Sequence, residues 1–99
     1  MISAEQYINK YNKNLLIYKL LEHLNKEKNI TERKFNEISR TNGFKTRFIG
    51  NGSGRMALMN HSNCWMKKYQ NIYGPIIKYH NGKYLLTNEW ICILEKTKI

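Results

Sequence analysis

The sequence predicts an α+β domain that is mostly helical, and three observations favour this fold class. Apolar residues recur at intervals of three and four over residues 8–24, which is the spacing of an amphipathic helix. Two short apolar runs flank Asn81-Gly82, a dipeptide typical of a β-hairpin turn. The 99 residues are 41% hydrophobic, which is enough for one packed core. We therefore expect a single domain over residues 1–99.

The first helical segment is expected over residues 3–28. Ser3 and Gln6 have the spacing of a capping box, in which each side chain bonds the backbone N–H of the other residue. The segment could break near Asn12-Lys13-Asn14, which would give a short arm followed by a helix. Its apolar stripe is longer than one core requires, so this segment is also a candidate dimerisation arm for a homodimer.

A second helix is expected after Thr31, which is a good N-cap residue. Ile30 and Phe35 stand at the two positions of a hydrophobic staple around that cap. Phe35 and Ile38 are expected to face the core. The helix is expected to end at Asn42-Gly43, because glycine accepts the left-handed conformation that follows many helices.

The middle of the chain is expected to hold a third helix. Residues 44–49 alternate apolar with polar side chains, which fits either a short strand or an extended loop. Ser53 is placed to cap the third helix, residues 60–63 could interrupt it, and residues 64–73 should be helical again. Gly74-Pro75 is expected to stop it.

The clearest local pattern is a hairpin followed by a short helix. Residues 76–79 and 83–87 read as strands, with His80-Asn81-Gly82 as the turn between them. Thr87 or Asn88 should cap a last helix that extends to Lys96. Cys92 is expected on the core face of this helix. Four of its apolar residues are expected in the core: Trp90, Ile91, Ile93 and Leu94.

The charge is strongly positive and unevenly distributed. Lys and Arg total 17 against seven acidic residues, so the formal net charge is +10. Residues 38–88 contain eight of the cations and no acidic residue. Solvated surfaces normally mix both signs, so this pattern indicates a surface that binds a polyanion such as nucleic acid. The alternative is a composition bias toward Lys, Asn and Ile that carries no function.

The order helix, helix, helix, β-hairpin and closing helix resembles a winged-helix domain, here over residues 30–96. The helix beginning at Ser53 resembles a recognition helix, and residues 74–87 resemble the wing. Residues 43–52 depart from the family pattern, because they are longer than the tight turn between the paired helices. The resemblance is to small regulators of bacterial, archaeal and viral type, and it implies DNA binding through the third helix and the wing.

The candidate nucleic-acid-binding residues follow from this resemblance and from the acid-free stretch. Arginine and asparagine can bond base edges in the major groove, and lysine neutralises phosphate. The glycine-rich turn before Ser53 could hold one phosphate on its amides, and His80 should add charge as the pH drops toward about 6. The alternative is an ordinary solvated surface. The candidates are Arg40, Lys45, Arg47, Ser53, Arg55, Asn60, His61, Lys67, Lys68, Lys78, His80 and Lys83.

The expected function is sequence-preferring binding of double-stranded DNA, as a small transcription regulator from a mobile element or virus. One alternative is a phage-type inhibitor, similar to anti-CRISPR proteins, whose basic face blocks a host nucleoprotein enzyme. Another is a module for single strands or RNA, in which aromatic side chains stack on bases. Six aromatic residues are candidates for such stacking: Trp65, Tyr69, Tyr73, Tyr79, Tyr84 and Trp90. Their helical and strand spacings place most of them in the core.

Other classes of protein have little support in the sequence. There is no Asp and no cluster of Glu that could hold catalytic metal ions, so no enzyme is expected. His61 and Cys64 could touch on a helix, but they lack a third group to orient a nucleophile. His80 and Cys92 do not complete a compact zinc site with them, so neither metal nor cofactor is expected. Without a signal peptide or an apolar membrane span, the protein is expected in the cytoplasm with both thiols reduced.

Overall fold

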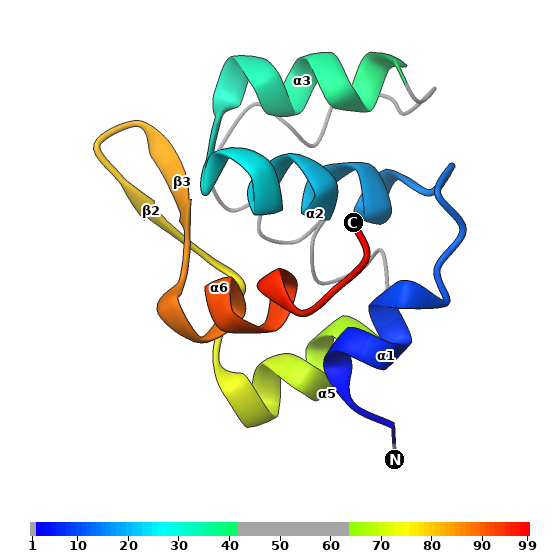
Figure 1. Cartoon of the computed structure of the whole chain (residues 1–99). Helices are drawn as coiled ribbons and strands as arrows, with labels where there is room; N and C mark the ends of the chain where they lie inside the picture. The colour runs from blue at the N-terminus through cyan, green and yellow to red at the C-terminus, as the bar shows by residue number, and fades with distance from the viewer. Residues whose placement is uncertain (1, 42–63) are drawn as a thin grey trace.

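Five helices and three short strands account for most of residues 2–41 and 64–99, which the computed structural model describes (Figure 1). The mostly helical α+β class predicted from the sequence is confirmed. Among the described residues, no helix combines the length and the apolarity that crossing a membrane requires. The elements in chain order are α1 (Ala4–Asn9), α2 (Leu16–Glu27), β1 (Asn29–Thr31), α3 (Glu32–Thr41), α5 (Cys64–Tyr73), β2 (Ile77–His80), β3 (Lys83–Leu86) and α6 (Asn88–Glu95).

Helix α1 is fixed at both ends by side-chain hydrogen bonds. The Ser3 hydroxyl accepts a bond from the Gln6 backbone N–H at 3.2 Å, and Gln6 Oε1 accepts one from the Ser3 N–H at 3.0 Å. The predicted capping box is therefore confirmed. At the other end, Asn9 Oδ1 accepts a bond from the Lys98 backbone N–H at 2.7 Å, which ties the helix to the C-terminal residues.

The segment over residues 3–28 forms two helices, and the break expected near Asn12 is confirmed. There Asn12 Oδ1 accepts a hydrogen bond from the Asn14 backbone N–H at 2.8 Å, a local bond that competes with helical geometry. Ala4 and Ile8 of α1 are completely buried. Helix α1 therefore packs onto the rest of the domain. The apolar stripe expected along one helical segment is divided between α1 and α2.

Helix α2 forms the centre of the core. Lys28 ends it in the left-handed conformation, with φ of 63°, and donates its backbone N–H to the Leu24 carbonyl at 2.8 Å. This reversal leads the chain directly into β1. The buried residues of α2 form one broad apolar face: Leu16, Ile17, Tyr18, Leu20, Leu21 and Leu24.

Strand β1 is an element that the sequence does not predict, because three residues are too few to show an alternating pattern. Thr31 ends this strand and also caps α3, since its hydroxyl accepts a bond from the Lys34 backbone N–H at 3.1 Å. The predicted cap is confirmed. Ile30 and Phe35, the two staple residues, are both buried.

The hairpin is tighter than the sequence predicts. Asn81 and Gly82 form a two-residue turn with φ of 49° and 81°, and His80 pairs with Lys83 as part of the strands. The expected three-residue turn is therefore wrong by one residue. Positive φ at both central positions matches the twist of the flanking strands, and Asn-Gly is the dipeptide that tolerates it best.

Strand β3 lies in the middle of an antiparallel sheet with the order β1-β3-β2. Tyr84 faces Ile30 on β1 and Tyr79 on β2, while Leu86 faces Ile77. Alternation places these side chains on one face of the sheet, toward the helices. The residues between them in sequence occupy the opposite face.

Helix α5 confirms the helical segment expected over residues 64–73. It ends at Tyr73, and the following Gly74 has φ of 87° and donates its N–H to the Gln70 carbonyl at 2.8 Å, so the predicted stop at Gly74-Pro75 is confirmed. The Tyr69 hydroxyl donates a bond to the Ile2 carbonyl at 2.7 Å and so joins α5 to the start of α1. The expected helix end at residues 42–43, the strand or loop over 44–49 and the helix start at Ser53 lie outside the described residues.

Helix α6 returns three of its expected apolar residues to the core. Trp90, Ile93 and Leu94 are buried, and Ile91 is partly buried against the same cluster. Cys92 is exposed, so its expected position on the core face is wrong. Five consecutive apolar residues give no period from which the exposed one can be identified.

Candidate nucleic-acid interface

The described residues include half of the candidate site. Arg40, Lys67, Lys68, Lys78, His80 and Lys83 belong to the described elements, and all six side chains are exposed. The other six candidates lie outside the described residues: Lys45, Arg47, Ser53, Arg55, Asn60 and His61.

Three of the candidates share one face of the hairpin. Lys78 pairs with Leu85, and His80 pairs with Lys83, so these residues alternate with the core-facing positions of the two strands. Lys78, His80 and Lys83 therefore project from the side of the sheet that faces away from the helices. The structure brings together three groups that were expected to act together.

The remaining described candidates lie on two different helices. Lys67 and Lys68 are on α5, which leads through Gly74 and Pro75 into the hairpin. Arg40 is in the last turn of α3. Figure 1 shows the hairpin beside the start of α3 and far from its end, so Arg40 does not join the hairpin cations.

No acidic residue belongs to α5 or to the hairpin. All seven glutamates lie on α1, α2, α3 and α6: Glu5, Glu22, Glu27, Glu32, Glu37, Glu89 and Glu95. We call the five described candidates without acidic neighbours on their own elements (Lys67, Lys68, Lys78, His80 and Lys83) the α5–hairpin surface.

The ion pairs show the same separation. Within residues 2–41 and 64–99, Lys34 pairs with Glu37 at 3.2 Å and Lys28 lies 3.9 Å from Glu95. Neither of these ion pairs includes a residue of the α5–hairpin surface. The four lysines of this surface are exposed, and neither α5 nor the hairpin carries a carboxylate beside them.

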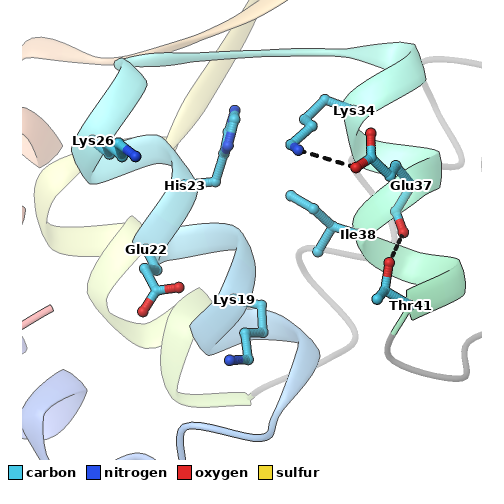
Figure 2. A pocket seen from close by; sticks show the side chains of 8 residues that line it. All are labelled: Lys19, Glu22, His23, Lys26, Lys34, Glu37, Ile38 and Thr41. Carbon is cyan, nitrogen blue, oxygen red and sulfur yellow. Dashed lines mark hydrogen bonds and ion pairs between the residues drawn. The ribbon is translucent and has the colours of Figure 1, made fainter.

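A second candidate site is a groove of about 440 Å³ between α2 and α3 (Figure 2). His23 on α2 and Lys34 on α3 point toward each other across it. Burial lowers the pKa of His23 below its ordinary value of 6.5, and the nearby Lys34 charge lowers it further. The groove is lined by Lys19, Glu22, His23, Lys26, Lys34, Glu37, Ile38 and Thr41.

The charges of this groove are mixed. Glu22 and Glu37 lie among its three lysines, and Lys34 is already paired with Glu37. Such a site is poorly suited to a polyanion, because each carboxylate repels it. The sequence did not single out His23, and an isolated histidine on an amphipathic helix carries no pattern that could have done so.

The candidate stacking aromatics divide into two groups. Tyr69, Tyr84 and Trp90 are at most 1% exposed and belong to the core, as their spacing predicts. Tyr73 is 36% exposed and Tyr79 is 61% exposed, so these two reach the surface. Trp65 lies outside the described side chains.

The groups considered for a metal site lie on separate elements where they are described. His80 is on the hairpin, and Cys92 is an exposed, free cysteine on α6. His61 lies outside the described residues, and Cys64 outside the described side chains. The described residues contain no group of three or more His, Cys, Asp or Glu placed to hold a metal ion.

Comparison with protein-family models, with curated proteins and with solved structures finds no match for this chain. The two candidate sites differ in their charge. The α2–α3 groove mixes both signs of charge, whereas α5 and the hairpin carry cations only. The α5–hairpin surface is the better candidate for binding a polyanion.

Proposed function

We propose that this protein binds double-stranded DNA through its α5–hairpin surface, as a small winged-helix transcription regulator from a mobile element or virus. One observation carries the proposal. Four lysines project from α5 and the hairpin, and all seven carboxylates of the chain lie on other elements. Scattered surface charge would put some acidic residues among these lysines, whereas a phosphate-binding surface excludes them.

The lysines supply affinity by neutralising phosphates. Each phosphate contact releases condensed counterions, which makes such binding favourable and sensitive to salt. Lys78 and Lys83 lie on the hairpin face that points away from the helices, where a duplex backbone can approach without displacing core residues.

The winged-helix assignment is supported by the order of the last elements, in which a helix leads into a tight hairpin and a closing helix. In this proposal the contacts that read bases come from four candidates that lie outside the described residues: Ser53, Arg55, Asn60 and His61. Arginine and asparagine supply the bidentate contacts that distinguish guanine and adenine. The hairpin then serves as the wing and holds the backbone.

Titration of the protein with a short DNA duplex at about 50 and about 200 mM salt tests this function. We expect five to eight phosphate contacts from the eight cations of residues 38–88, each of which adds about −0.9 to the slope of log affinity against log salt. The oligomeric state is measured in the same solutions, because a dimer doubles the contacts. Absence of binding at the lower salt concentration, or a flat salt response, would contradict the proposal and favour an acidic protein as the partner.

A further inference from the structure

We infer that Tyr79 stacks on an unpaired base, so that the preferred target is a duplex with a single-stranded extension. This inference rests on the proposed nucleic-acid function and assigns a ligand class to the hairpin. Its basis is the position of an exposed aromatic ring next to Lys78 in sequence, on the strand that forms one edge of the sheet among the described strands. Every base has a flat face that can stack on an aromatic ring, whatever the sequence.

The exposure of Tyr79 is unusual for its position. Ile77, Tyr84 and Leu86 share its face of the sheet, and all three are at most 4% exposed. Tyr79 is 61% exposed, which is more than the other exposed large apolar side chains of the described chain. Its ring therefore lies beyond the helices that cover the rest of this face, near the turn.

The ring is held in place although it is exposed. Its centroid lies 5.1 Å from that of Tyr84, with an angle of 61° between the rings, which is an edge contact. Tyr84 is completely buried and so gives a fixed support. A ring held in this way loses little conformational entropy when a base stacks on it, which favours binding.

The hairpin places the Tyr79 ring where a nucleic-acid strand can reach it. Figure 1 shows that the hairpin projects from the helical body, and the two-residue turn at Asn81 and Gly82 keeps its end narrow. The strand order β1-β3-β2 leaves one edge of β2 unpaired among the described strands. A nucleic-acid strand that follows this edge can place a base against Tyr79 on one face of the sheet while its backbone passes Lys78 on the other.

The other exposed apolar side chains do not offer the same combination. Tyr73 is engaged with Trp90, whose ring centroid lies 6.2 Å away in an edge contact. Ile72 and Leu15 have no flat ring on which a base could stack. Lys78, which precedes Tyr79, is exposed and projects from the opposite face of the same edge strand. A nucleic-acid strand therefore fits this position better than an apolar protein surface does.

The test compares a blunt duplex with the same duplex carrying a short single-stranded tail, at one salt concentration. We expect the parent protein to bind the tailed duplex at least about five-fold more tightly, the lower limit for one stacked base. Tyr79→Leu should lose this preference and bind the blunt duplex as the parent does. Tyr79→Phe should keep the preference, because stacking requires the ring and not the hydroxyl. Photo-crosslinking with 5-iodouracil in the tail, mapped by peptide mass spectrometry, should identify Tyr79.

Ile72→Ala is the matched control, because it removes an exposed apolar side chain from α5 and should leave the preference intact. Circular dichroism checks that each variant is folded. Equal binding of both duplexes by the parent would overturn the inference while the DNA-binding function stands. A preference that survives Tyr79→Leu would also overturn it. If neither duplex binds, both the inference and the proposed function are wrong.

Discussion

The indole Nε1–H of Trp90 donates a hydrogen bond to the Gly74 carbonyl at 2.8 Å. Trp90 is completely buried in α6, and Gly74 ends α5 just before the hairpin. Close by, the Thr87 hydroxyl donates a bond to the Pro75 carbonyl at 2.6 Å. The closing helix therefore fixes the junction between the two elements that carry the candidate nucleic-acid surface.

Trp90→Phe is expected to lower the free energy of unfolding by about 2 kcal/mol or more. The change removes a hydrogen bond to a part-buried carbonyl and leaves space beside the smaller ring. Urea denaturation measures the effect. Cys92→Ser, at an exposed position of the same helix, should change stability by less than about 0.5 kcal/mol. Equal denaturation midpoints for Trp90→Phe and the parent would show that this junction contributes nothing to stability.

Gly82→Ala is expected to destabilise the protein by about 1–2 kcal/mol, because φ of 81° is unfavourable for a residue with a Cβ atom. A Cβ atom at Gly82 would meet nothing within 4 Å, so the cost is conformational and not a clash. Asn81→Gly at the neighbouring position should be tolerated, since glycine accepts positive φ freely. The comparison is again by urea denaturation. Gly82→Ala with the stability of the parent would contradict the two-residue turn.

The elements that could be predicted from the sequence are those with local causes. The capping box at Ser3, the cap at Thr31 and the hairpin turn at Asn81 each depend on residues only a few positions apart. Strand β1 could not be predicted, because it forms only through pairing with β3, more than 50 residues later in the chain. Cys92 was misplaced because an uninterrupted apolar run has no period.

The candidate site was predictable in its charge and only partly in its arrangement. The acid-free stretch identified the lysines of α5 and the hairpin. It also included Arg40, which the fold places at the far end of α3, away from the hairpin. The exposure of Tyr79 could not be predicted, since alternation puts it on the same face as the buried Tyr84. Its exposure depends on how far the helices extend under the sheet, which is a tertiary property.

Tyr69→Phe is expected to cost about 1 kcal/mol, the usual contribution of one hydrogen bond, here to the Ile2 carbonyl. Because that bond holds the start of α1, hydrogen exchange should become faster in residues 4–9 and stay unchanged in α6. Tyr79→Phe, at an exposed tyrosine, serves as the control. Unchanged exchange in residues 4–9 would show that α1 is held by its apolar contacts alone.

The raised pKa of Tyr69 also predicts a loss of stability at alkaline pH. Burial raises the pKa of its phenol above the ordinary value of 10.0, so the folded state favours the neutral form. This contribution is fully present below pH 10.0 and is lost as the pH rises through the raised pKa. Tyr69→Phe should therefore show a smaller decrease of stability than the parent when the pH rises above 10.0.

The lowered pKa of His23 predicts a loss of stability at acid pH. Burial and the Lys34 charge lower its pKa below 6.5, so between the two values the unfolded chain binds more protons than the folded one. The contribution is present above pH 6.5 and is lost as the pH falls through the lowered pKa. His23→Gln should reduce the difference in unfolding free energy between pH 7.5 and pH 5. Lys34→Gln removes only the second cause and should reduce that difference less. A His23→Gln profile that superimposes on that of the parent would contradict the assignment.

The double change Lys78→Ala with Lys83→Ala tests whether the hairpin holds phosphates. Both side chains are exposed, so folding should be intact, and affinity should fall for every duplex regardless of sequence. The slope of log affinity against log salt should become shallower by about two, since each lost phosphate contact removes about 0.9. Lys10→Ala with Lys13→Ala is the matched control, because it removes the same charge from exposed positions between α1 and α2, across the molecule from the hairpin (Figure 1). That control should lower affinity slightly through the weaker overall field and leave the slope nearly unchanged. If both double variants shift affinity and slope alike, the hairpin contributes only to net charge and makes no phosphate contacts of its own.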